Sequence, residues 1–172
     1  MDATKCIEKR GVAVTVPHWN EATCVQCNQC SYVCPHAAIR PVAMTEAEAA
    51  KAPEGMQMKD LNQMPGYKFA IVVSAFDCTG CGSCVNVCPD KVQAITMTGF
   101  EAHEDEQKYF DYAVSLEDKE DVIEKFKEAT VKGSQFKQPL LEFSGACAGC
   151  GETAYIKLVT QLFGDRMMIA NA

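Results

Sequence analysis

Several features that define other classes of protein are missing from this 172-residue chain. No apolar run approaches the roughly 18 residues that a membrane-spanning helix needs, so we expect no membrane association. The N-terminus lacks the charged and then apolar leader of a secreted protein. Positive charge is scarce, because 16 basic residues face 23 acidic ones and the formal net charge is -7, which argues against a nucleic-acid partner. We therefore predict a soluble, cytoplasmic protein.

Cysteine, by contrast, is abundant, with 11 residues. Eight of them form two copies of one pattern, which reads CVQCNQCSYVCP over 24–35 and CTGCGSCVNVCP over 78–89. In each copy the gaps between cysteines are two, two and three residues, and a proline follows the last cysteine. This is the bacterial ferredoxin pattern for cubane iron–sulfur clusters. The sequence therefore predicts two [4Fe–4S] clusters and a role in electron transfer.

The ligands of these two clusters are expected to cross between the motifs. Three cysteines of a motif can wrap around one cluster, whereas the fourth begins a helical turn, points away and ligates the other cluster. Cluster 1 is thereby assigned four ligands: Cys24, Cys27, Cys30 and Cys88. Cluster 2 is assigned the complementary four: Cys78, Cys81, Cys84 and Cys34. The crossing would join the two halves and keep the clusters close enough for fast electron transfer.

Other uses of the cysteines fit less well. Paired CxxC units also bind structural zinc, but strict repetition of four cysteines and a proline is typical of clusters. A disulfide framework is disfavoured by the odd number of cysteines and the missing leader. Cys6 lies outside any ligand spacing and is interpreted as a bystander thiol. His36 is expected at the surface, and Trp19 is expected to pack over the apolar side of a cluster.

Residues 1–98 are predicted to form an α+β, two-[4Fe–4S] ferredoxin-like domain. Alternating apolar residues indicate strands at four places: 12–16, 37–39 onward, 67–73 and 94–97. An insertion over about 41–66 separates the two motifs. It begins with a capping box, TEAE at 45–48, which predicts a short helix. Three methionines follow and are interpreted as adaptable packing against a neighbouring surface: Met56, Met58 and Met64. The insertion is interpreted as a docking surface for another domain.

Residues 99–138 are predicted to be an acidic helical connector. Ser115 is a candidate N-cap for a helix over about 117–129. Three apolar residues would form the buried stripe of that helix: Val122, Ile123 and Phe126. The sequence KGS at 132–134 is interpreted as a linker.

Residues 139–172 contain a second type of cysteine motif, SGACAGCGET, in which Cys147 and Cys150 form a CxxC. Apolar residues at helical spacing over 155–163 predict a helix after it, and a strand is expected over 166–170. This order is typical of the start of an α/β domain. Alone, the CxxC also fits a redox pair or half of a zinc site. Two cysteines cannot complete a four-ligand cluster.

Long strings of the sequence resemble the single-chain pyruvate:ferredoxin (flavodoxin) oxidoreductase family. Besides the two cysteine motifs, the strings are EKRGVAVTVPHW, FDYAVSLEDKEDV, KGSQFKQPLLEFSGACAGCGETAYIKL and LFGDRMMIANA. The resemblance runs from Glu8 to Ala172. It implies a ferredoxin-like domain followed by the truncated start of a thiamine-diphosphate-binding domain. It also implies that Cys147 and Cys150 are two of the four ligands of a third, proximal [4Fe–4S] cluster.

The resemblance implies the electron-transfer portion of an enzyme that converts pyruvate and coenzyme A to acetyl-CoA and carbon dioxide. Electrons would pass through the clusters to ferredoxin or flavodoxin. The third cluster and thiamine diphosphate with Mg²⁺ would be complete only in a full-length enzyme, expected to be a homodimer. This chain alone is not expected to be catalytically complete, and Glu152 and Thr153 receive no catalytic role. The alternative is a self-standing two-cluster electron carrier; the long insertion and SGACAGCGET argue against it.

Overall fold

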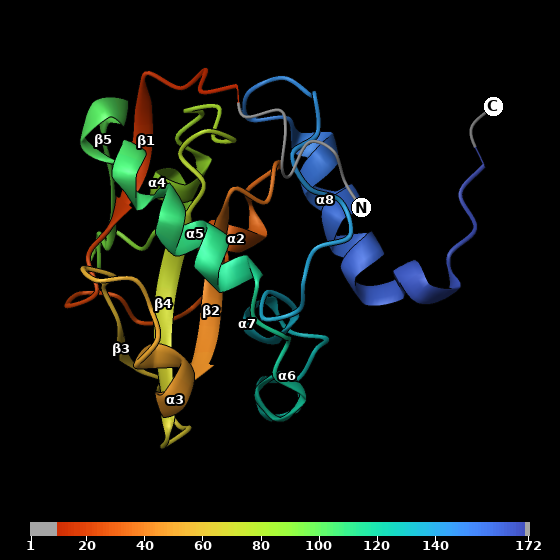
Figure 1. The fold of residues 1–172 in the computed structure, drawn as a ribbon. Coiled ribbons are helices and arrows are strands. Elements are labelled where there is room, and N and C mark those ends of the chain that lie inside the picture. Colours follow the sequence, from red (N-terminus) through yellow and green to blue (C-terminus); the bar gives the residue numbers. More distant parts are fainter. Residues whose placement is uncertain (1–9, 171–172) are drawn as a thin grey trace.

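The computed structural model describes residues 10–170, and the interpretation of Cys6 lies outside this range (Figure 1). Two small antiparallel sheets flank the cysteine motifs. One sheet pairs β1 (Thr15–Trp19) with β5 (Ile95–Gly99). The other contains β2 (Ile39–Thr45), β4 (Tyr67–Val73) and the short edge strand β3 (Lys59–Asp60). Each sheet therefore joins a flank of the first motif to a flank of the second, as a pseudo-twofold arrangement requires.

The first strand lies further along the chain than predicted. Val12 and Val14 are 61% and 85% exposed, and β1 begins only at Thr15. Pro17, which directly follows the strand predicted over 12–16, lies within β1 and is paired with Met97. A proline is tolerated there because each strand of a two-stranded ribbon has one edge that makes no ladder hydrogen bonds. The predictions of strands after the first motif and on both sides of the second are confirmed.

The first residues of the predicted insertion are part of a strand, because β2 continues to Thr45. The capping box is confirmed: Glu48 N–H donates to Thr45 Oγ1 at 3.3 Å, and Thr45 N–H donates to Glu48 Oε2 at 2.8 Å, which opens α3 (Glu46–Ala49). Met56 is buried, and Met58 and Met64 pack against the main core. The surface against which the methionines pack is therefore this chain's own core. The interpretation of the insertion as a docking surface stays a prediction.

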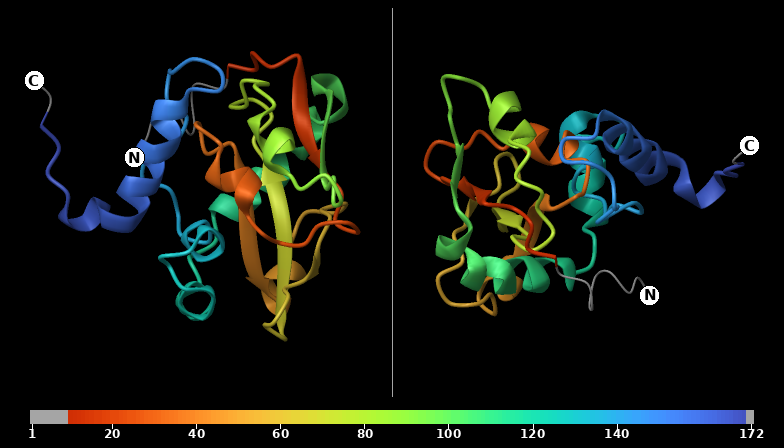
Figure 2. Two further views of the ribbon diagram at one scale, coloured as in Figure 1. Left: turned by 180° about the vertical axis from the view of Figure 1, so that it is seen from behind. Right: turned by 90° about the horizontal axis from the view of Figure 1, so that it is seen from above.

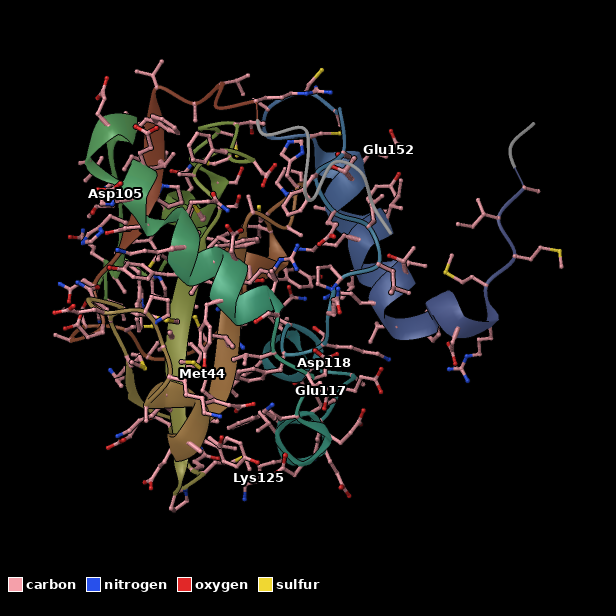
Figure 3. All side chains as sticks on the ribbon, viewed as in Figure 1. Met44, Asp105, Glu117, Asp118, Lys125 and Glu152 are labelled. Carbon is pink, nitrogen blue, oxygen red and sulfur yellow. The ribbon has the colours of Figure 1, made fainter. Side chains whose placement is uncertain are left out.

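The connector folds into three helices, α5 (Gln107–Val114), α6 (Glu120–Phe126) and α7 (Val131–Ser134). Ser115 follows the end of α5 and does not cap the next helix, so that prediction is wrong. The buried stripe of α6 is confirmed by Val122 and Ile123. Figure 3 labels Glu117 and Asp118 on the segment that leads into this helix and Lys125 in its last turn.

The linker predicted over 132–134 is also wrong, because it forms most of α7. Gly133 and Ser134 are buried, and a side chain at Gly133 would collide with the backbone of Lys127. Two 3-10 turns, η1 (Phe100–Ala102) and η2 (Glu104–Glu106), connect β5 to α5.

The main core lies between the β2–β4 sheet and the helices of the connector. Helix α5 crosses one face of this sheet (Figure 1). Fully buried side chains come from both layers: Met44 and Phe69 from the strands, and Phe110 and Val122 from the helices. This core holds the flanks of both cysteine motifs in place.

Helix α8 (Gly151–Phe163) is confirmed and lies beside the ferredoxin-like part, followed by the 3-10 turn η3 (Gly164–Arg166). The strand predicted over 166–170 does not form; Met168 and Ile169 are 97% and 72% exposed. The C-terminal segment projects away from the body of the molecule (Figure 2). None of the helices in residues 10–170 combines the length and apolarity needed to cross a membrane.

Candidate iron–sulfur centres

The eight motif cysteines line two separate cavities. The first site is the cavity lined by four of them: Cys24, Cys27, Cys30 and Cys88. The second site is lined by the other four: Cys34, Cys78, Cys81 and Cys84. Each cavity therefore combines three cysteines of one motif with the last cysteine of the other motif. These are the two sets predicted from the sequence. The ten cysteines within the described residues are free thiols.

Apolar strand residues complete the walls of both cavities. Ile71 and Ile95 border the first site, and Ile39 and Met97 border the second. The four residues come from three strands of the two sheets: β2, β4 and β5. The sheets therefore enclose sulfur ligands in a low-dielectric setting, which is one of the factors that set the reduction potential of an iron–sulfur cluster.

Backbone amides point at cysteine sulfurs in the same way at both sites. After each leading cysteine, the residue two positions on donates its N–H to that sulfur at 3.4 Å: Gln26 to Cys24 and Gly80 to Cys78. The last cysteine of each motif likewise accepts an N–H at 3.3 Å: Cys34 from Ala38 and Cys88 from Ala94. Such hydrogen bonds to sulfur also tune cluster potentials.

These amide directions depend on left-handed backbone at matched positions. The values of φ are +60° at Gln26 and +67° at Gly80, and +61° at Asn28 and +75° at Gly82. Glycine adopts this conformation at no steric cost, whereas for other residues it is less favourable by about 1–2 kcal/mol of conformational free energy. The first motif therefore accepts strain that the second avoids.

Two buried side chains in the first motif compensate with hydrogen bonds. Gln26 Nε2 donates to Asp60 O at 2.7 Å, and Asn62 N–H donates to Gln26 Oε1 at 2.8 Å. Asn28 Nδ2 donates to Lys132 O at 2.9 Å. Gln26 thereby ties the first site to the insertion, and Asn28 ties it to α7. Sequence reasoning missed both residues, because polar side chains between cluster ligands look like ordinary surface positions.

The thiols themselves favour a metal partner. Burial raises the pKa of Cys30 well above its ordinary value, and nearby Cys84 and Cys24 add to the effect. Burial also raises the pKa of Cys78 to about 11 and that of Cys84 to about 12. Four thiolates can share such a cavity only if cations compensate their charges, and iron in a cluster does this. The donor set therefore fits an iron–sulfur cluster at each site.

The two sites are neighbours, and the CxxC loop adjoins one of them. Cys30 of the first site and Cys84 of the second are close enough to interact electrostatically. A Cβ at Gly149, between the two cysteines of the CxxC, would lie 3.4 Å from Cys81 Cβ. Cys147 is exposed. The loop therefore rests on the second site.

Cys150 is the N-cap of α8, whose first turn contains Glu152, labelled in Figure 3. Hydrogen bonds from the amides of Thr153 and Glu152 lower the pKa of the Cys150 thiol. A thiolate is the form that binds a metal, so this position favours a ligand role. Sequence reasoning identified Cys150 from the CxxC alone.

A buried lysine that sequence reasoning missed lies beside both sites. Lys157 Nζ, on α8, donates to Ser31 O at 2.5 Å and to Cys34 O at 3.0 Å. Burial lowers the pKa of Lys157 to about 8. The inward face of α8 carries Lys157 and Gln161, whereas Tyr155 and Phe163 are 57% and 45% exposed. The apolar stripe that predicted the helix therefore does not face this chain's core.

Two expectations about residues near the sites require correction. His36 is 2% exposed, not at the surface, because its Nδ1 lies 3.1 Å from Ser144 O and it lines the second site. Trp19 is buried, as expected of packing, but it contacts the Phe69 ring edge-on and lines neither cysteine cavity.

The eight thiols and the two sheets around them define the class of protein. Residues 23–92 match the family described as the 4Fe-4S dicluster domain, so this part of the chain is a two-cluster iron–sulfur domain.

Relatives identify the larger family. The chain is 56% identical to a pyruvate-flavodoxin oxidoreductase of Enterobacter agglomerans over 98% of its length, and 58% identical to a pyruvate:ferredoxin oxidoreductase of Moorella thermoacetica over 96%. It is 52% identical over 98% of its length to a pyruvate dehydrogenase [NADP(+)] of Cryptosporidium parvum. It spans 14% of the first two proteins and 9% of the third. The chain therefore corresponds to one segment of the pyruvate:ferredoxin and pyruvate-flavodoxin oxidoreductases.

Proposed function

We propose that this chain is the electron-transfer portion of a pyruvate:ferredoxin or pyruvate:flavodoxin oxidoreductase. The complete enzyme would oxidatively decarboxylate pyruvate with coenzyme A, releasing acetyl-CoA and carbon dioxide and passing two electrons to ferredoxin or flavodoxin. The observation that carries this proposal is the series of adjacent sulfur sites: the CxxC loop beside Cys81, the second site, and the first site beyond it. The names of the relatives supply the substrate and the acceptors.

Each four-cysteine set is proposed to hold one [4Fe–4S] cluster, which takes up and releases one electron at a time. The chain's own residues position and tune it. Thiolates hold the iron, amides of Gln26 and Gly80 donate to the leading sulfurs, and apolar strand residues exclude water. Cys147 and Cys150 are proposed as two of the four ligands of a third cluster, whose other ligands lie outside these residues.

We propose a direction for electron flow from the positions of the sites: from the CxxC loop to the second site and then to the first. The CxxC loop lies beside Cys81 of the second site, so electrons would enter there and leave from the first site. Lys59 Nζ donates to Cys24 O at 2.9 Å there, and Val25 is 50% exposed. This exposed edge of the first site is the proposed exit to the acceptor.

The remaining domains of the oxidoreductase are the other proposed partners. The outward face of α8 exposes Tyr155, Val159 and Phe163, which is an apolar surface of the kind that a neighbouring domain covers. Thiamine diphosphate with Mg²⁺, the third cluster and a homodimeric state are proposed for the full-length enzyme only. Reduced thiolates also support a cytoplasmic location. No residue of this chain is proposed to be catalytic, so the chain alone would not oxidise pyruvate.

Reassembly tests this function against the alternative of a self-standing carrier. This chain would be produced anaerobically together with the remaining segments of the Moorella thermoacetica enzyme, and pyruvate- and coenzyme A-dependent reduction of a viologen dye would be measured. We expect activity with the intact chain, unchanged activity with Ala148→Ser and loss of activity with Cys150→Ala. Absence of activity from a cluster-loaded, associated assembly would favour the self-standing carrier.

A further inference from the structure

Three potential metal ligands converge away from the cysteines. They are His18 on β1, His103 between the two 3-10 turns, and Glu106 at the end of η2. One ligand atom from each lies within 4.8 Å of the other two. The two imidazole rings are tilted by 31° with their centroids 4.8 Å apart. Asp105, labelled in Figure 3, marks this end of the molecule, well away from α8.

The local fold fixes these three residues relative to one another. His18 is paired with Thr96 across the β1–β5 ribbon, and the chain turns back after β5. His103 N–H donates to Phe100 O at 2.9 Å, and Glu106 N–H donates to His103 O at 3.1 Å. The site is therefore preorganised by backbone hydrogen bonds.

The ring of His103 carries the strongest indication of a ligand. The residue is 8% exposed, and its Nε2 lies 2.6 Å from Thr98 Oγ1. Within residues 10–170, its Nδ1 has no hydrogen-bond partner, although Glu106 Oε2 is 2.9 Å away. The carboxylate is thus close to the nitrogen without being placed to accept its proton. A cation between them would bind both groups and would satisfy the buried His103 nitrogen, whose desolvation is otherwise uncompensated.

Metal-bound histidines commonly have this arrangement, in which one ring nitrogen binds the ion and the other is fixed by a polar neighbour. Thr98 is that neighbour here. An entry path also exists, because His18 and Glu106 line a pocket that opens between β1 and the insertion at Gly55 and Met56.

We propose that His18, His103 and Glu106 bind a divalent transition-metal ion of the zinc type. Two imidazoles and one carboxylate suit zinc, and three protein ligands leave a position for water. The ion would link the turns before α5, which carry His103 and Glu106, to His18 on β1. It would be distinct from the iron of the cysteine sites, whose ligands are all sulfur.

Zinc binding to the whole cluster-loaded chain, handled anaerobically, tests this site. The protein would be equilibrated with buffered free Zn²⁺, its zinc and iron counted, and its zinc X-ray absorption fine structure recorded. We expect about one zinc per chain in addition to iron, with nitrogen and oxygen ligands at about 2.0–2.1 Å. Sulfur ligands at about 2.3 Å would place the zinc in the cysteine sites and overturn the proposal. Absence of zinc would also overturn it.

Matched variants show which residues bind the ion. Glu106→Gln and His18→Gln, at partly exposed positions, are each expected to weaken zinc affinity at least about tenfold while iron content is unchanged. Glu104→Gln, an exposed residue of the same turn, serves as the control and should bind zinc as the parent does. Unchanged affinity in Glu106→Gln would mean that His103 and Glu106 form only an ion pair. Because iron content is read separately, failure here leaves the electron-transfer function untouched.

Discussion

The first and second cysteine sites have the same backbone geometry but are supported differently. At the first site, the left-handed positions are occupied by Gln26 and Asn28; at the second, they are Gly80 and Gly82. The side chains of the first pair reach the insertion and α7. At the second site a side chain on Gly80 would be crowded, because its Cβ would lie 3.0 Å from Thr15 O.

This difference shows how the insertion and the connector support the first site. The insertion and connector are attached to it through buried hydrogen bonds, whereas the second site is packed directly against β1 and the CxxC loop. Two sites that share a motif can thus acquire different neighbours by changing two residues between the ligands. The comparison predicts unequal responses to matched substitutions.

Replacing Gln26 with glycine should have the largest effect. Glycine adopts the same φ, so the change removes two partly buried hydrogen bonds without requiring a new backbone conformation. We expect the free energy of local opening of the insertion to fall by about 3 kcal/mol, or roughly 100-fold in amide hydrogen exchange over residues 57–66. Gln63→Gly is the control, because Gln63 also has a positive φ, +68°, but is exposed. Equal exchange in both variants would contradict the anchoring role of Gln26.

Alanine at the two glycines of the second motif should have smaller, unequal effects. Gly80→Ala adds a tight contact with Thr15 O to the left-handed strain, whereas Gly82 has no atom within 4 Å of its Cβ position. We expect costs of about 2–3 kcal/mol at Gly80 and about 1 kcal/mol at Gly82. The rate at which cluster absorbance is lost in denaturant measures the difference. Similar rates would show that backbone strain alone, and not the space beside β1, determines the choice of glycine.

Replacing Lys157 with methionine should produce the smallest effect, which is a shift in the reduction potential of the cluster proposed for the second site. Its ammonium group donates to the carbonyl of Cys34, a proposed ligand of the second site. Removing a positive charge favours the oxidised cluster, so we expect the second site's potential to fall by on the order of tens of millivolts, more than the first site's. Redox titration followed by electron paramagnetic resonance would measure both. The exposed Lys125→Met is the control, and an equal shift there, or a rise, would exclude a local effect of Lys157.

Much of the ferredoxin-like part could be predicted from the sequence. The cysteine spacing grouped the eight thiols as the two cavities do, and alternating residues located β4. These signals are reliable because a thiol motif and a half-buried strand each impose a short, regular period on the chain. Whether the grouped thiols are the ligands remains a prediction.

The remaining features depend on contacts that no local period encodes. Helix α8 was predicted from its apolar stripe, yet its inward face is polar, because the carbonyls of Ser31 and Cys34 satisfy Lys157. His36 is buried because Ser144, far along the chain, lies beside its ring. The turn-like KGS sequence forms a buried helix for a similar reason: α7 is capped by Thr130 and packs against the short helix α2 (Gln29–Tyr32) of the first motif.

The crossing of ligands between motifs is tested most directly by two double variants. In Cys24→Ala/Cys88→Ala both losses fall on the first site, so about one intact cubane per chain, or about four iron atoms, should remain. In Cys24→Ala/Cys34→Ala each site loses one ligand, so no intact cubane should remain. Spin quantification of the reduced proteins, together with iron and sulfide analysis, distinguishes them. The opposite result, with a full cluster surviving only in Cys24→Ala/Cys34→Ala, would mean that each motif binds its own cluster.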